Sequence, residues 1–214
     1  MELHPGLFFF QSVLTPDQQR TLWTMCRTLA DGPVPMYKPT VRGGKTMSVG
    51  MLCLGLHWNG QRYEYEEVRS DHDRLRVPPI PDAMRELAAG AAARAGFEIR
   101  PDTCIMNFYD SDSRMGVHQD KDEPKETIAA GIPIVSLSIG DTARFVVGGL
   151  SRKDPTGPLM LRSGDVVVMG GPSRLRFHGV TRILPGTAPE GTGPGRFNLT
   201  FRQYWPASPT PSPR

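Results

Sequence analysis

Two histidines and one aspartate are the residues of this chain best suited to chemistry. His118 and Asp120 are separated by one residue, and His178 follows far downstream. Residues two apart in a β-strand point to the same side, so His118 and Asp120 can present an imidazole and a carboxylate to one ion. Two imidazoles and a carboxylate form a facial triad, which leaves metal positions open and is typical of non-haem Fe(II). The three residues therefore predict an Fe(II) site that activates oxygen.

This triplet is a weak signal when it stands alone. The chain has five histidines, and His-x-Asp arises often by chance, so a hydrogen-bonded surface pair is the alternative. The interpretation as a metal site depends on further polar residues that follow in an order suited to one pocket.

A strand-like segment near the C-terminus, residues 196–202 with the sequence RFNLTFR, supplies such residues. Strand periodicity places its polar side chains on one face, namely Arg196, Asn198, Thr200 and Arg202. Guanidinium groups bind carboxylates through paired hydrogen bonds. This face therefore predicts a site for a carboxylate-bearing co-substrate, with Arg202 as an anchor, and a solvated polar side of an ordinary sheet is the alternative.

Residues 103–109 alternate in the same way. Asn107 and Tyr109 fall on one side of the expected strand, and both can donate hydrogen bonds to the same small acid. The alternative is an asparagine and a tyrosine in a strand without a ligand.

Two helices and many short strands are expected to position these groups. Thr15, Pro16 and Gln18 are typical of a helix start, and this helix should end near Leu29. An Ala-rich helix should follow over about residues 82–95, before Gly96. Strands are predicted at about residues 50–56, 103–109, 132–139, 144–147, 157–161, 165–169 and 196–204. We expect an α+β fold, mainly β, with a jelly-roll (double-stranded β-helix) core and N-terminal helices.

Length and composition are those of one ordinary globular domain. The chain has 214 residues, of which 38% are hydrophobic and 22% charged, with a net charge of +3. We expect one domain over residues 1–205 and a disordered Pro- and Ser-rich tail over 206–214. The sequence shows neither a membrane-spanning apolar run nor a signal-peptide pattern, so we expect a cytoplasmic monomer without a membrane partner. Three scattered cysteines are expected to be reduced and buried.

Taken together, these segments resemble the AlkB family of Fe(II)- and 2-oxoglutarate-dependent dioxygenases, in particular its bacterial alkylation-repair branch. The resemblance spans about residues 47–203. It is carried by NFY (107–109), HQDKDEP (118–124), VSLS (135–138), GDVVV (164–168), RL (174–175), HG (178–179) and RFNLTFR (196–202). The combination of HQDKDEP with RFNLTFR is specific.

The resemblance implies a role for each matching residue. The Fe(II) ligands, which O2 would join on the metal, are His118, Asp120 and His178. The 2-oxoglutarate pocket is formed by Asn107, Tyr109, Arg196, Asn198 and Arg202. The target base is contacted by Asp122, Arg152 and three aromatic residues, Trp58, Tyr63 and Tyr65. These three belong to a nucleotide-recognition lid over residues 33–80, called the lid segment below.

The resemblance also implies an activity. The protein should oxidatively demethylate alkylated bases such as 1-methyladenine and 3-methylcytosine, in single- or double-stranded DNA and, as a further option, in RNA. Formaldehyde and succinate would be released, and alkylation damage would be repaired. Such lesions are cationic, so the carboxylate of Asp122 would favour them electrostatically. A target base must be flipped from its duplex or be single-stranded to reach a buried ion.

The chain differs from a member of this family at two places that bear on the choice of substrate. The lid segment is slightly shorter than in a relative, and Met169 stands where that relative has a tryptophan. One alternative is therefore a 2-oxoglutarate oxygenase acting on RNA modifications or protein. Another is a non-catalytic nucleic-acid-binding module with a structural metal, although structural sites are usually closed whereas this ligand set leaves positions open.

Overall fold

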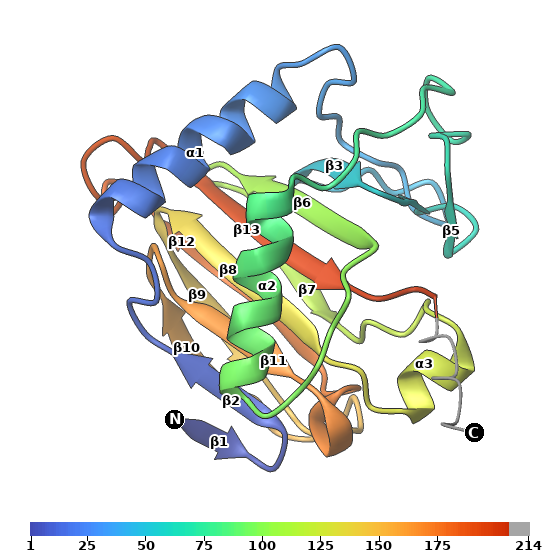
Figure 1. Ribbon diagram of the computed structural model, residues 1–214. Helices are drawn as coiled ribbons and strands as arrows, with labels where there is room; N and C mark the ends of the chain where they lie inside the picture. The colour runs from blue at the N-terminus through green and yellow to red at the C-terminus, as the bar shows by residue number, and fades with distance from the viewer. Residues whose placement is uncertain (206–214) are drawn as a thin grey trace, which may run out of the picture.

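The computed structural model describes residues 1–205, and its core is a pair of facing antiparallel sheets (Figure 1). The seven strands of the larger sheet are, in spatial order, β1 (Glu2–His4), β2 (Leu7–Phe10), β11 (Val166–Met169), β8 (Ile134–Gly140), β13 (Arg196–Arg202), β6 (Thr103–Tyr109) and β3 (Gly50–Leu54). The smaller sheet contains β10 (Gly157–Leu161), β9 (Thr142–Val147), β12 (His178–Leu184) and β7 (Met115–His118). The prediction of a mainly β, jelly-roll core is confirmed.

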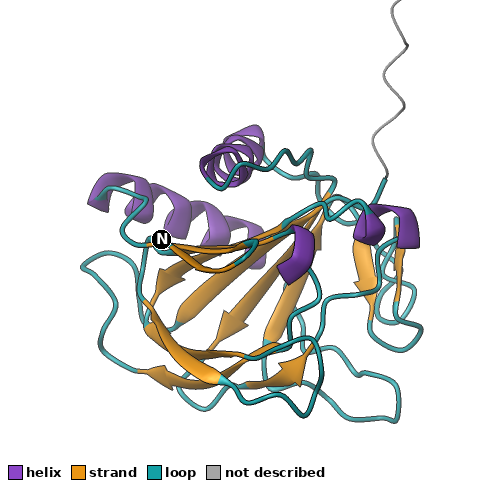
Figure 2. Ribbon diagram, turned by 90° about the horizontal axis from the view of Figure 1, so that it is seen from below, coloured by secondary structure: helices purple, strands orange, loops and turns teal. Residues whose placement is uncertain are grey.

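Both predicted helices cover the outer face of the larger sheet (Figure 2). Helix α1 (Pro16–Ala30) begins at a capping box, in which Thr15 and Gln18 bond reciprocally, as the sequence predicts. Helix α2 is Asp82–Arg94. Their apolar stripes pack with Phe197 and the other apolar residues of β13 into one core.

The opposite face of β13 is also buried, because it looks into the space between the two sheets. Arg196 is 0% exposed and Arg202 is 6% exposed. The alternative of a solvated polar face is therefore wrong. Apolar residues from both sheets, such as Tyr109, Phe145 and Val180, fill the remainder of this space.

The lid segment contributes β3 to the larger sheet and then forms a separate hairpin of β4 (His57–Asn59) and β5 (Glu64–Glu66). The predicted strands occur with ends that shift by a residue or two. Seven elements were not predicted, namely β1, β2, β4, β5, β7, β12 and helix α3 (Lys125–Ala129). All of them except β12 are short. The three cysteines are buried and free, as expected.

The predicted tail at 206–214 lies outside the described residues. Among residues 1–205, no helix combines the length and apolar composition needed to cross a bilayer.

Candidate active site

The structure brings the three predicted metal ligands together at the edge of the smaller sheet. His118 ends β7, His178 begins β12, and the two residues lie opposite each other across the strand pair. Asp120 lies between their imidazoles, with its carboxylate oxygens 3.5 Å from Nε2 of His118 and 3.6 Å from Nε2 of His178. One ligand atom from each residue lies within 4.8 Å of the other two, so the three residues can hold one ion.

Local backbone features produce this arrangement. The pairing shifts by one residue between His178 and Val180, so β7 carries a bulge beside the site, as strands near active sites often do. A Cβ on Gly179 would lie 2.8 Å from the carbonyl oxygen of Met115. Only glycine therefore allows the close approach of β7 and β12.

Hydrogen bonds orient both imidazoles for metal binding. Nδ1–H of His118 donates to the carbonyl of Gly116 at 2.8 Å, and Nδ1–H of His178 donates to that of Arg176 at 2.9 Å. Each bond leaves Nε2 as the bare nitrogen on the side of Asp120. Burial raises the pKa of Asp120, but the guanidinium of Arg202 opposes this effect, and the pKa lies well below its usual range. The donor set, two imidazoles and a carboxylate, fits Fe(II).

Arg196 offers unused hydrogen-bond donors in the interior. Its Nη2 donates to Oγ of Ser138 at 2.9 Å, whereas Nε and Nη1 are buried without a partner. Burial lowers the pKa of Arg196 to about 10. Its guanidinium carbon lies 5.3 Å from the ring of Tyr109. A buried cation with free donors is costly unless an anion pairs with it, and the distal carboxylate of 2-oxoglutarate would be such an anion.

The two predicted asparagines face each other across β6 and β13. Nδ2 of Asn198 donates to Oγ of Ser136 at 2.8 Å and to the carbonyl of Leu137 at 3.1 Å. Oδ1 of Asn107 is buried without a partner. Asn107 therefore has polar capacity left for a ligand, while the amide nitrogen of Asn198 is used to hold β8.

The guanidinium of Arg202 is already paired with carboxylates, unlike that of Arg196. Its Nη2 lies 2.8 Å from the carboxylate of Asp120 and its Nη1 lies 3.4 Å from that of Glu123. Nη1 also donates to the hydroxyl of Tyr65. The geometry thus gives the two arginines different surroundings, with Arg202 beside the metal ligands and Arg196 deeper in the interior.

Two buried charged residues were given no role by the sequence reasoning. Glu123 and Arg174 form an ion pair of 2.8 Å in which both side chains are almost fully buried. Nη1 of Arg174 also donates to the backbone carbonyl of Asp120 at 2.6 Å. Both residues stand inside the motifs HQDKDEP and RL, but only the fold shows that their charges are buried.

Three of the five predicted base-contacting residues lie together beside the metal ligands. Trp58 and Tyr65 are cross-strand partners in the β4–β5 hairpin. Nε1–H of Trp58 donates to the carboxylate of Asp122 at 2.8 Å, and the hydroxyl of Tyr65 donates to Glu123 at 3.1 Å. Burial raises the pKa of Asp122, and the bond from Trp58 opposes that rise.

The other two lie further out. The ring of Tyr63 packs edge-on against Trp58, with centroids 5.7 Å apart. Arg152 is exposed on the turn between β9 and β10, and its guanidinium carbon lies 5.2 Å from the ring of Phe177. The side chain of Gln119 donates to the carbonyl of Leu150 in this turn at 3.5 Å, which brings the turn close to the His118–Asp120 triplet.

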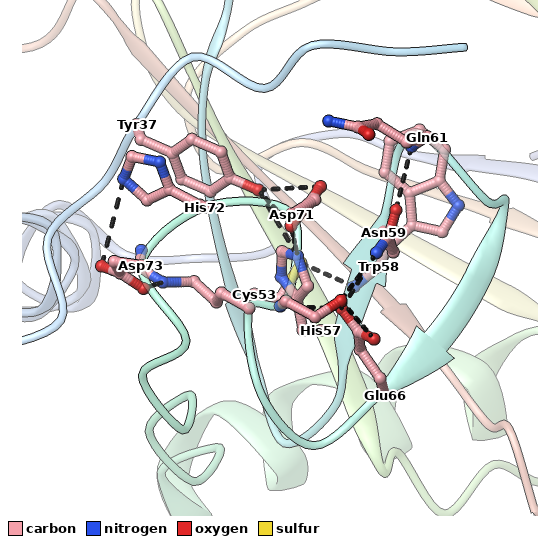
Figure 3. A network of polar contacts seen from close by, with 12 residues as sticks. Tyr37, Cys53, His57, Trp58, Asn59, Gln61, Glu66, Asp71, His72 and Asp73 are labelled. Carbon is pink, nitrogen blue, oxygen red and sulfur yellow. Dashed lines mark hydrogen bonds and ion pairs between the residues drawn. The ribbon is translucent and has the colours of Figure 1, made fainter.

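The other face of the hairpin carries a polar network that ties the lid segment together (Figure 3). The imidazole of His57 lies 2.7 Å from the carboxylate of Asp71, and the hydroxyl of Tyr37 bonds to both residues. Glu66 accepts hydrogen bonds from Asn59 and Ser70. His57, Glu66 and Asp71 are close enough to hold an ion. The hydrogen bonds of Asp71 with His57 and of Glu66 with Asn59 and Ser70 fix the hairpin to its neighbouring loops, while Nδ1 of His57 is buried without a partner among the described residues.

Comparison with known proteins identifies relatives along most of the chain. Residues 6–202 match the family model of the 2OG-Fe(II) oxygenase superfamily. The chain is 40% identical to an alpha-ketoglutarate-dependent dioxygenase AlkB homolog of Caulobacter vibrioides, over 93% of this chain and 88% of that protein. It is 41% identical to alpha-ketoglutarate-dependent dioxygenase AlkB of Escherichia coli, over 79% of this chain and 77% of that protein.

Plant proteins and a solved structure are similar as well. The chain is 37% identical over 94% of its length to DNA N(6)-methyladenine demethylase ALKBH1D of Arabidopsis thaliana, but it spans only 50% of that protein. The chain thus covers about half the length of this relative. The structure of OsALKBH1 matches with a TM-score of 0.89 and 36% identity, covering 95% of this chain and 99% of that one.

Proposed function

Because this chain belongs to the AlkB family of the 2OG-Fe(II) oxygenase superfamily, we propose that it oxidatively demethylates alkylated bases in DNA. Fe(II) and 2-oxoglutarate are the cofactors of this family. The observation that carries the proposal is the combination of the His118, Asp120 and His178 cluster with the buried guanidinium of Arg196 and the Trp58–Asp122 pair.

The metal would be held by Nε2 of the two histidines and by the carboxylate of Asp120. Bound Fe(II), together with 2-oxoglutarate and O2, supplies the oxidation of an N-methyl group. The free donors of Arg196 and the hydroxyl of Tyr109 would bind the distal carboxylate of 2-oxoglutarate, which would relieve the unpaired charge described above. Asn107, Asn198 and Arg202 complete the pocket in this proposal.

The lid segment would select the base. The indole of Trp58 offers a stacking surface, worth about 1–3 kcal/mol per base in single-strand binding. Its Nε1–H donor holds the carboxylate of Asp122 beside it, where a positively charged methylated base would be favoured. Tyr63 and Arg152 would contact the nucleotide from the rim of the site.

A second candidate substrate is N6-methyladenine, which is named as the substrate of the Arabidopsis relative. Unlike 1-methyladenine and 3-methylcytosine, this base is neutral, so the charge of Asp122 would bring it no electrostatic advantage. Its amino N–H could still donate to that carboxylate. The charge of the preferred base therefore distinguishes the two substrates.

A panel of oligonucleotides tests both proposals. Purified protein with Fe(II), ascorbate and 2-oxoglutarate should release formaldehyde and succinate from DNA that contains 1-methyladenine or 3-methylcytosine. N6-methyladenine DNA and the corresponding RNAs, single- and double-stranded, are run in parallel and read by mass spectrometry. If metal is shown to be bound and none of these substrates yields formaldehyde, the demethylase proposal is refuted.

A further inference from the structure

A closed set of buried polar contacts holds Asp120 from two sides. Arg174 binds its backbone carbonyl and Arg202 binds its carboxylate. Both arginines then meet on Glu123, at 2.8 Å and 3.4 Å. We call Asp120, Glu123, Arg174, Arg202 and Tyr65 the Glu123 network. No member of the network is more than 9% exposed, so solvent weakens these contacts little.

Tyr65 connects the lid segment to this network. Its hydroxyl accepts a hydrogen bond from Arg202 and donates one to Glu123 at 3.1 Å. The hairpin that carries Tyr65 is braced on its opposite face by the His57–Asp71 pair (Figure 3). A displacement of the hairpin therefore moves Trp58 and Tyr65 together, and it removes a partner from both Glu123 and Arg202.

We propose that Glu123 and Tyr65 are positioning residues that couple closure of the lid segment to binding of the metal and of 2-oxoglutarate. The inference rests on the metal and co-substrate site of the proposed function. With Glu123 and Tyr65 in place, the guanidinium of Arg202 is shared among three partners. Without them it turns wholly to Asp120 and competes with the ion for that carboxylate.

Linkage makes this coupling reciprocal. If closure of the lid segment favours metal binding, the metal must favour closure by the same factor. The hairpin should therefore become better protected from solvent when metal and 2-oxoglutarate bind, even without nucleic acid. This response separates a positioning role from a purely structural one, which would leave the protection of the hairpin independent of the metal.

The test compares Tyr65→Phe and Glu123→Gln with the unmodified full chain. Each variant keeps the size of the side chain and removes one element of the network. Tyr204→Phe is the matched control for the first variant, because the ring of Tyr204 packs on Tyr65 at 5.3 Å and its hydroxyl bonds to no described residue. Glu126→Gln is the control for the second, because Glu126 is an exposed carboxylate on α3.

Three measurements are made without nucleic acid: the Kd of Mn(II), the Kd of 2-oxoglutarate in the presence of Mn(II), and hydrogen exchange of the amides of residues 57–66. We expect Tyr65→Phe to weaken Mn(II) binding about fivefold, the worth of one hydrogen bond. Glu123→Gln should weaken it about tenfold or more, as for other residues that orient metal ligands. Mn(II) with 2-oxoglutarate should slow hydrogen exchange of the hairpin amides in the unmodified protein and in both controls. The same ligands should slow this exchange much less in Tyr65→Phe and Glu123→Gln.

Unchanged Mn(II) and 2-oxoglutarate affinities in folded Tyr65→Phe would overturn the proposal, as would hairpin exchange that ignores the metal in the unmodified protein. If Glu123→Gln does not fold, as judged by thermal melting, Tyr65→Phe decides alone. These readouts are independent of the reaction. Coupling without formaldehyde release would refute the proposed function only, and demethylation without coupling would refute this inference only.

Discussion

Replacement of Arg196 by methionine should separate stability from co-substrate binding. The pKa of Arg196 is lowered by burial to about 10, more than two pH units below that of ordinary arginine. At roughly 1.4 kcal/mol per unit, its charge costs the co-substrate-free protein about 3 kcal/mol. Arg196→Met removes this cost and also loses the bond to Ser138, which is worth about 1.5–3 kcal/mol because one partner is charged.

The two effects nearly offset each other, so the variant should be as stable as the unmodified protein or up to about 1.5 kcal/mol more stable. For a domain of this size that corresponds to a melting temperature that is unchanged or raised by up to about 3–6 °C. Binding of 2-oxoglutarate should fall by about two orders of magnitude, because its distal carboxylate would be buried without a partner. Addition of 2-oxoglutarate should therefore raise the melting temperature of the unmodified protein and leave that of the variant unchanged.

Differential scanning fluorimetry and titration calorimetry, both with Mn(II), measure these quantities. Arg144→Met is the control, because Arg144 is exposed on β9 and its loss should change neither quantity. The reasoning is refuted if Arg196→Met loses several kcal/mol of stability while it binds 2-oxoglutarate as tightly as the unmodified protein. Arg196 would then be a structural residue whose unpaired donors have no ligand.

Four further predictions concern the metal, the base and the fold. Asp120→Ala should abolish Mn(II) binding and turnover, whereas Asp17→Ala, at an exposed aspartate of α1, should leave both intact, and metal titration with the formaldehyde assay checks this. Trp58→Ala should weaken binding of methylated oligonucleotide by about 1–3 kcal/mol yet spare uncoupled decarboxylation of 2-oxoglutarate, and equal affinity in a fluorescence titration would contradict the stacking role. Because burial raises the pKa of Asp122, its carboxylate is ionised only above that raised value, so affinity for a cationic base should decline on acidification sooner than for an ordinary aspartate. Asp122→Asn should remove this pH dependence of Kd. Thr15→Ala should lose about 1 kcal/mol of unfolding free energy in urea denaturation, because it breaks the capping box of α1.

Local sequence was sufficient for some elements. The capping box predicted the start of α1, and the run of strand-forming residues TCIMNFY predicted β6 with both of its ends. Strand alternation showed which side chains of β13 share a face, but not whether that face meets water. That depends on the smaller sheet, in which β7 is too short, and β12 (HGVTRIL) alternates too weakly, to be predicted from the sequence.

The sequence predicted which residues form the site, but not which of them pair with one another. Sequence order suggested His118, Asp120 and His178 as one cluster, and the structure brings them together. It suggested Arg202 as a co-substrate anchor, whereas in the fold Arg202 is bound to Asp120 and keeps only Nε unpaired, and Arg196 has two donors free, Nε and Nη1. The carboxylates and the hydroxyl that pair with Arg202 come from other segments of the chain. The local sequence of β13 therefore cannot show which of its two arginines will be paired.

The pairing of β7 with β12 has a consequence for how the protein acquires its metal. His118 and His178 come together only when these two strands adopt one register with its bulge, and about sixty residues of chain separate them. Closing such a long loop is slow and must precede the contacts it allows. The unfolded chain therefore contains no preformed site, and an ion that binds only the finished register adds its binding energy to the stability of the folded state. Added Mn(II) should accordingly slow unfolding and leave the rate of folding almost unchanged, so that metal uptake is the last event of folding.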